Sequence, residues 1–297
     1  MGVKMNRQYK DRVLRKLLSE SKENALSLYN ALNNSSYTNA EDLEFNTIED
    51  VIYMGMKNDF SVLFQMEINL YEHQSTLSAN YPLRGFLYLP RLYESYIQKR
   101  RLNVYGSKLV KIPTPHYVVL YNGKEDTEEQ YELKLSDAFE HAGGCVELTC
   151  TVYNINAGHN PELMERCPLL REYAELVARI RGGQDGGLSI DDAVNEAVDS
   201  CIREGILKDF LLKHKAEVVG MLLTEYNEAE TMELLREEAR EEGRVEGREE
   251  GREAGREEAL LYSLRTLMEA NGWTPLQSMD CLKIPAEKRQ RFSKLLV

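Results

Sequence analysis

Several features that mark membrane, secreted or zinc-binding proteins are missing from this sequence. Its 297 residues contain no run of about 18 apolar residues, so we expect no membrane-spanning helix. The N-terminal region has no long apolar segment followed by small residues, so we expect no secretory signal. The five cysteines form no CxxC pair, and their odd number favours free thiols in a reducing cytoplasm. The sequence also shows no nucleotide-binding glycine loop and no Ser/His/Asp arrangement.

Positive charge is scarce overall, but it is concentrated in one stretch. The net charge of −12 argues at first against nucleic acid, because phosphate binding needs lysine and arginine. However, residues 228–259 alone hold thirteen glutamates and six arginines. Residues 84–111 hold seven lysines and arginines against one acid, Glu94. The overall acidity therefore does not exclude a nucleic-acid partner for this basic stretch.

The hydrophobic pattern of the first 155 residues predicts a mixed α/β domain. Apolar residues recur at helical spacing in two stretches, and short apolar runs bounded by turn residues predict strands in four others. The predicted helices are 6–32, interrupted near 19–24, and 80–101; the predicted strands are Phe60–Phe64, Ile68–Tyr71, Tyr117–Tyr121 and Val146–Tyr153.

The remainder of the chain is predicted to be all-α. Residues 156–227 form a helical region packed on the α/β domain, with one helix ending at Gly182-Gly183 and others at 189–204 and 206–226. Residues 228–262 form a long charged helix with a repeated EGR pattern, and residues 263–297 form a helical end. The glycine ridge of the repeat fits either a close contact between helices in a homo-oligomer or a solvated spacer, and the lack of an apolar seam favours the spacer.

Two acidic residues flank the predicted hairpin of Phe60–Phe64 and Ile68–Tyr71. Asp59 precedes the first strand, and Glu72 follows the second, with Gln74 two residues later. Antiparallel pairing would bring both carboxylates to one end of a sheet, where they would suit Mg²⁺. Two ordinary surface carboxylates are the alternative, because exposed acids are common.

Two neighbouring residues compete with this interpretation. Glu67 with Asn69 offers another register for the second acid, but it falls in the predicted turn and stands only eight residues after Asp59. His73 alternates to the opposite strand face from Glu72, so we interpret it as structural.

Asp59, the hairpin and Glu72-x-Gln74 resemble the PD-(D/E)XK nuclease motif, in which the last position is usually lysine. The sequences NLYEHQST, Pro82-Leu83-Arg84 and PTPHYVVLYNG are similar to the recombination-promoting nuclease (Rpn), or YhgA-like putative transposase, family. INAGHNPEL, IREGILKDFLLKHKAEVVGMLLTEYNE and the charged EGREEG tail resemble the same family, so the resemblance covers roughly residues 6–260. It implies a restriction-endonuclease-like mixed sheet flanked by helices, with a PD-(D/E)XK domain over residues 1–155.

The resemblance implies metal-assisted hydrolysis of DNA in the cytoplasm. Asp59 and Glu72 would hold Mg²⁺, or Mn²⁺, and Gln74 would position the attacking water or the phosphate. Glutamine in place of lysine offers hydrogen bonds without a charge. The residues expected to contact DNA are Arg84, Tyr88, Lys99, Arg100 and Arg101. A core-rim role for Arg84 and Tyr88, and a solvated helix end for the other three, are the alternatives.

Two other functions fit the same sequence. A catalytically inactive DNA-binding or assembly protein would act through the charged helix 228–262. A metal-dependent hydrolase acting on RNA would use the same centre as the DNA endonuclease.

Overall fold

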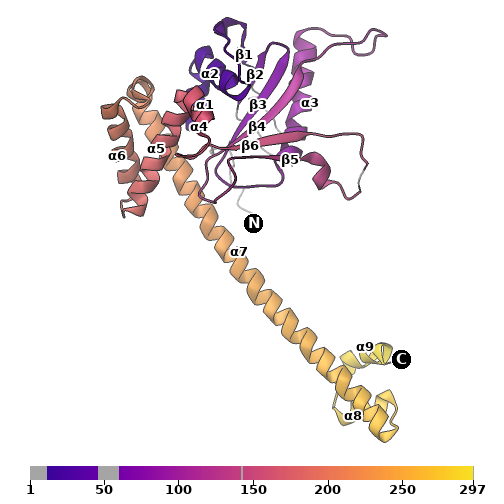
Figure 1. Ribbon diagram of the computed structural model, residues 1–297. Helices are drawn as coiled ribbons and strands as arrows, with labels where there is room; N and C mark the ends of the chain where they lie inside the picture. The colour runs from indigo at the N-terminus through magenta and orange to yellow at the C-terminus, as the bar shows by residue number, and fades with distance from the viewer. Residues whose placement is uncertain (1–11, 46–59, 142, 297) are drawn as a thin grey trace. The chain divides into compact units, whose positions relative to one another are not determined.

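The computed structural model describes residues 12–45, 60–141 and 143–296, which form a mixed sheet and helices (Figure 1). The predicted α/β class with a helical C-terminal region is therefore confirmed. The chain divides into two compact units, Met1–Glu228 and Ala229–Val297. None of the helices in the described ranges is long and apolar enough to cross a bilayer.

The strands are β1 (Glu44–Phe45), β2 (Phe60–Phe64), β3 (Glu67–Gln74), β4 (Thr114–Tyr121), β5 (Gln130–Lys134) and β6 (Thr149–Asn154). The helices of the first unit are α1 (Arg12–Ser19), α2 (Lys22–Leu32), α3 (Tyr81–Lys99), α4 (Pro161–Arg166), α5 (Pro168–Asp185) and α6 (Ile190–Glu204), with short 3₁₀ turns η1 (Ala40–Asp42) and η2 (Leu135–Ala138). Helix α7 (Lys208–Asn271) continues into the second unit, which also contains α8 (Pro275–Cys281) and α9 (Ala286–Leu295).

The six strands form one sheet in the order β1-β2-β3-β4-β6-β5. The hairpin of β2 and β3 is antiparallel, as predicted, and Phe60 pairs with Tyr71. Strands β3, β4 and β6 are parallel to one another, with Glu72 opposite Val119. The carboxyl ends of these three strands therefore meet at one edge of the sheet, where open α/β sheets usually bind ligands.

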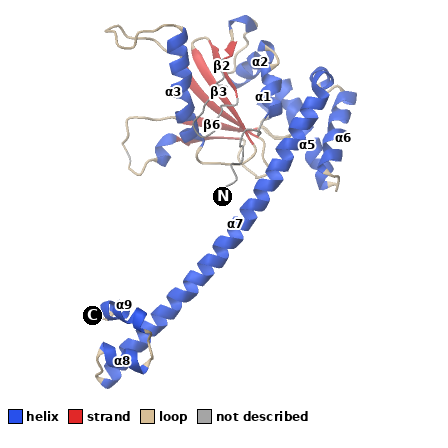
Figure 2. Cartoon of the chain, turned by 180° about the vertical axis from the view of Figure 1, so that it is seen from behind, coloured by secondary structure: helices blue, strands red, loops and turns tan. Residues whose placement is uncertain are grey.

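Each face of the sheet carries its own hydrophobic core, and Figures 1 and 2 show helices on both sides. Side chains alternate along a strand, so Leu70 and Glu72 of β3 face α3, while Tyr71 and His73 face the opposite side. The α3 side is formed by Leu70, Tyr81, Tyr88, Leu92, Tyr117 and Val119, among others. The opposite core joins β2 and β3 to α1, α2, α5, α6 and the start of α7.

The structure corrects three details of the predicted elements. Gly182 and Gly183 lie inside α5, which continues to Asp185, so the predicted helix end there is wrong. The helical region before them is split into α4 and α5 at Cys167, because Pro168 begins a new helix. Strand β5 was not predicted, because its residues are exposed or half-buried and carry no apolar run.

The second unit has a small core of its own. Leu264, Met279, Ile284 and Phe292 bring α7, α8 and α9 together. Surface ion pairs join Glu257 to Arg291 at 2.7 Å and Glu253 to Lys288 at 3.7 Å. The glycines at 243, 247, 251 and 255 lie in α7, and an added Cβ at each would meet no atom within 4 Å. The homo-oligomer through this ridge stays a prediction.

A glycine allows α3 to approach the sheet closely. A Cβ added to Gly85 would lie 2.4 Å from two ring carbons of Tyr117 and 3.1 Å from Leu148. We expect Gly85→Ala to lower the free energy of unfolding by about 1–3 kcal/mol, as overpacked cores do. Urea denaturation measures this change.

Gly220→Ala is the matched control, because Gly220 lies inside α7 with no atom within 4 Å of an added Cβ. Alanine there should raise stability by about 1 kcal/mol through helix propensity alone. Stabilisation of similar size in both variants would contradict the close-approach role of Gly85.

Candidate active site

A buried carboxylate lies near the carboxyl end of β3. Glu72 is only 3% exposed, because its strand lies between β2 and β4 and its side chain faces α3. Burying an ionised carboxylate is costly unless charged or hydrogen-bonding partners replace the lost water. The partners of Glu72 therefore define this site.

Three side chains from three elements donate hydrogen bonds to Glu72. Arg84 of α3 donates from Nη2 to Oε1 in an ion pair, and the hydroxyl of Tyr117 on β4 donates to Oε2. Gln74 of β3 donates from Nε2 to Oε1 at 3.0 Å. Glu72 and Gln74 are thus brought together, as their spacing of two residues predicts.

The side chain of Arg84 is partly exposed, while that of its partner Glu72 is buried. Its side chain is 28% exposed, and its Cζ is 5.1 Å from the centre of the Tyr81 ring. Its Nε is buried and has no hydrogen-bond partner among the described residues. Arg84, which was expected to contact DNA, is therefore paired with Glu72, and its buried Nε donor is unused by the described residues.

Asp59, the other predicted metal ligand, lies outside the described residues. Phe60, the next residue in the sequence, pairs with Tyr71, which precedes Glu72. In the described part of the chain, no three His, Cys, Asp or Glu side chains are grouped closely enough to hold a metal ion.

The buried thiol of Cys150 on β6 is close enough to Arg84 to feel its charge. Burial raises the pKa of this thiol to about 12, and the positive charge of Arg84 opposes the shift. Cys150 is therefore a neutral thiol near neutral pH and is not suited to act as a nucleophile.

The competing residues lie elsewhere. Glu67 begins β3, about 16 Å along the strand from Glu72, and accepts a hydrogen bond of 2.7 Å from Tyr29. Burial raises the pKa of the Tyr29 hydroxyl, and this hydrogen bond raises it further. His73 is on the face opposite Glu72, where its ring packs edge-on against Tyr173 at 5.5 Å.

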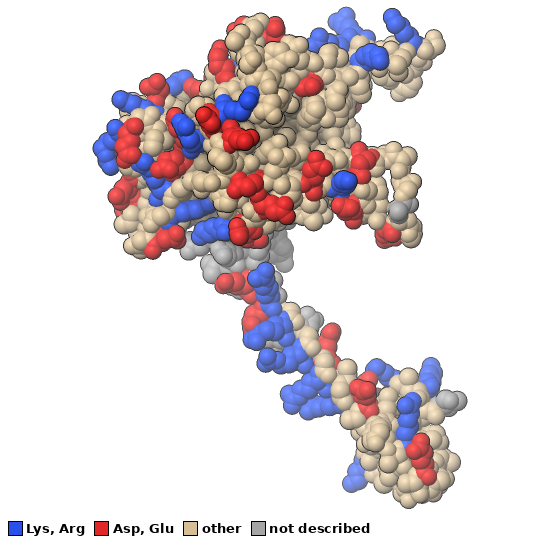
Figure 3. All heavy atoms as spheres, in the orientation of Figure 1, with Lys and Arg blue, Asp and Glu red and all other residues tan. Residues whose placement is uncertain are grey.

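The other residues expected to contact DNA are not at this site. Tyr88 is 4% exposed in the core under α3, which favours its core role. Lys99, Arg100 and Arg101 are exposed at the far end of α3, about 22 Å from Arg84 along the helix. Arg100 forms an ion pair of 3.0 Å with Glu44. Lysine and arginine side chains gather on the loop that follows α3 (Figure 3).

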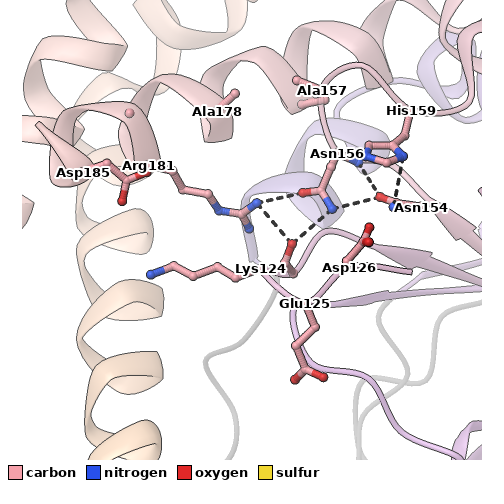
Figure 4. A pocket seen from close by; sticks show the side chains of 13 residues that line it. Lys124, Glu125, Asp126, Asn154, Asn156, Ala157, His159, Ala178, Arg181 and Asp185 are labelled. Carbon is pink, nitrogen blue, oxygen red and sulfur yellow. Dashed lines mark hydrogen bonds between the residues drawn. The ribbon is translucent and has the colours of Figure 1, made fainter. Parts of the chain in front are cut away.

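A cleft of about 560 Å³ lies at the carboxyl ends of the neighbouring strands β4 and β6 (Figure 4). Arg181 of α5 donates to Asn156 Oδ1 at 2.7 Å and to the backbone and side-chain oxygens of Asn122 at 2.6 and 2.8 Å. Asn156 in turn donates to Asn154 at 2.9 Å. Through these bonds from its two Nη atoms, Arg181 holds α5 against this edge of the sheet. All of these acceptors are neutral.

The sequence reasoning missed this network. The signal was an asparagine directly after each of two apolar strands, at Asn122 and Asn154, where polar residues often mark a ligand-binding edge. The edge is continuous with the first site, because Asn122 donates its backbone N–H to the carbonyl of Gln74 at 2.8 Å.

Comparisons of this sequence with protein-family models and curated proteins, and of its fold with solved structures, give no match.

The ion pair at the site should be measurable in the free energy of unfolding. Arg84→Met should lower it by about 2–4 kcal/mol, because a buried carboxylate would lose its only cationic partner among the described residues. Glu72→Gln combined with Arg84→Met should be less damaging than the sum of the single changes, with a coupling of about 1–3 kcal/mol. Chemical denaturation of the four proteins completes this cycle.

Arg179→Met is the matched control. Arg179 has a similarly exposed side chain, at 23%, but its partners Glu175 and Glu204 are at the surface. Its replacement should cost less than about 1 kcal/mol. Additive effects at Glu72 and Arg84 would contradict the coupling.

Proposed function

We propose that the protein is a metal-dependent endonuclease that hydrolyses phosphodiester bonds in DNA, with its catalytic centre at Glu72. The observation that carries the proposal is a buried carboxylate near the end of a central strand, surrounded by an arginine, an amide and a hydroxyl. A carboxylate can hold a divalent metal ion, and a neighbouring cation and amide can bind a phosphate, so the group suits metal-assisted phosphodiester hydrolysis.

The arrangement of elements supports the finer fold assignment. An antiparallel hairpin (β2 and β3) is followed by a helix, α3, and then by β4, which runs parallel to β3. This order suits the restriction-endonuclease-like sheet that the Rpn resemblance implies, and Glu72 and Gln74 lie near the carboxyl end of β3. The fold assignment remains part of the proposal.

The carboxylate of Glu72 has the chemistry to accept Mg²⁺. A carboxylate offers about four acceptor positions, and donors occupy two on Oε1 and one on Oε2. Glu72, together with Asp59, would hold the ion, and Mg²⁺ commonly uses one or two carboxylates in this way. When bound, the metal would lower the pKa of an attacking water and stabilise charge on the phosphate.

Arg84 and Gln74 would act on the substrate. The buried Nε of Arg84, which is unused beside the paired Nη2, can donate a hydrogen bond to a phosphate oxygen. Gln74 would orient the attacking water or a phosphate oxygen through its amide, because it carries no charge. Tyr117 would hold the Glu72 carboxylate in place.

Nicking of supercoiled plasmid DNA tests the proposal. The wild-type protein should nick with Mg²⁺ or Mn²⁺ and not with EDTA. Asp59→Asn and Glu72→Gln should each slow nicking by about 100-fold or more, because metal catalysis contributes several kcal/mol. Rates from gel electrophoresis, with circular dichroism to verify folding, provide the measurement.

Glu67→Gln is the matched control, since it makes the same change on the same strand about 16 Å from Glu72. It should nick at nearly the wild-type rate. Equal residual nicking by the Glu72 and Glu67 variants would refute the assigned centre. If the wild-type protein cleaves an RNA of the same length as the DNA but does not cleave the DNA, RNA would replace DNA as the proposed substrate.

A further inference from the structure

The loop after α3 is basic and strongly exposed. No aspartate or glutamate occurs between Glu94 and Glu125, while lysine and arginine occur at 99, 100, 101, 108, 111 and 124. We call residues 99–112 the basic arm. Tyr105 within it is 98% exposed, and Leu109 is 77% exposed. An exposed aromatic ring among cations is the combination on which single-stranded nucleic acids bind.

The arm is fastened at its base to the body of the first unit. The backbone N–H of Leu102 bonds to the Ile97 carbonyl at 3.0 Å, and the hydroxyl of Tyr93 bonds to the Pro113 carbonyl at 2.8 Å. Between these bonds, every residue except the half-buried Val110 is exposed. The arm is therefore held at both ends by hydrogen bonds and exposes its side chains to solvent between them.

Most of the arm's cations are available to a partner. Arg100 is paired with Glu44 and lies 5.3 Å from the Tyr96 ring centre. The other four, Lys99, Arg101, Lys108 and Lys111, form no ion pair with a described residue. Their uncompensated charge favours a polyanion, since each phosphate neutralised releases counterions.

We propose that the basic arm is a DNA-binding element, with Lys99, Arg101, Lys108 and Lys111 on phosphates and the ring of Tyr105 stacked on an unpaired base. The choice of DNA rests on the proposed nuclease function. Arg84 and Lys99 are about 22 Å apart along α3, which corresponds to about six or seven nucleotides at 3.4 Å each. A phosphate polymer can reach both places, whereas a small anion cannot.

Binding of the full chain to a labelled 30-nucleotide single strand, in EDTA to prevent cleavage, tests the arm. Arg101→Gln, Lys108→Gln and Lys111→Gln together should weaken binding about 100-fold at 0.1 M salt. The slope of log K against log salt should become shallower by about 2. Tyr105→Ala should weaken binding about 5-fold or more without changing the slope, and Tyr105→Phe should bind like the wild type. Fluorescence anisotropy measures all four proteins.

The control variant combines Lys134→Gln, Arg203→Gln and Lys208→Gln, which remove the same charge from exposed positions outside the arm. It should bind within a few-fold of the wild type. Equal losses of DNA affinity in the two triple variants, or no loss in either, would overturn the proposed DNA-binding role of the arm. If the triple variant of the arm binds DNA normally but no longer binds phosphatidylserine vesicles, the proposed DNA-binding role would be overturned in favour of binding to a membrane surface.

The arm and the catalytic centre can fail separately. Glu72→Gln should bind the single strand in EDTA about as tightly as the wild type, and in Mg²⁺ it should nick plasmid DNA about 100-fold or more slowly. If DNA binding depends on the arm but the wild-type protein does not nick DNA, the proposed nuclease activity alone would be refuted. Nicking that depends on Glu72, with binding unaffected by the arm variants, would refute the arm alone.

Discussion

The arrangement of the first unit depends on keeping one buried carboxylate stable. Glu72 is nearly inaccessible to water, so its charge must be balanced by groups that the fold supplies. Those groups come from β3 itself, from the parallel neighbour β4 and from the helix that connects them. The site is therefore complete only when the whole β3–α3–β4 unit has formed, which couples the stability of the unit to the geometry of the site.

Two glycines make this coupling possible. At Gly85, the absence of a side chain lets α3 approach the ring of Tyr117, so that the helix carrying Arg84 meets the strand carrying the hydroxyl donor. At Gly123, a Cβ would lie 2.4 Å from the carbonyl oxygen of Ser75, so any larger residue would push apart the segments that follow β3 and β4. Both close approaches involve the parallel strands β3 and β4. Gly85 lies against Tyr117, and Gly123 lies against Ser75, the residue after Gln74.

The local parts of this arrangement were predictable from sequence, and the long-range parts were not. The hairpin, the start of α3 near Pro82 and the shared face of Glu72 and Gln74 follow from short-range patterns. The contact of Glu72 with Tyr117 joins residues 45 apart and depends on the parallel register of β3 and β4. Likewise, the bonds from Arg181 to Asn122 span 59 residues, and the apolar face of β5 consists of only two half-buried residues, Tyr131 and Leu133.

The pairing of Arg84 with Glu72 also bears on how such a centre would respond to substrate. The guanidinium neutralises the carboxylate, so a buried negative charge is not left alone. If Glu72 and Asp59 hold the proposed divalent cation, the Glu72 carboxylate would no longer depend on Arg84 alone for neutralisation. Arg84 would then be available to the phosphate that arrives with the cation, and its partly exposed side chain gives it a path to do so. In the proposed nuclease, the ion pair that stabilises the buried carboxylate would thus also supply a cation for the phosphate.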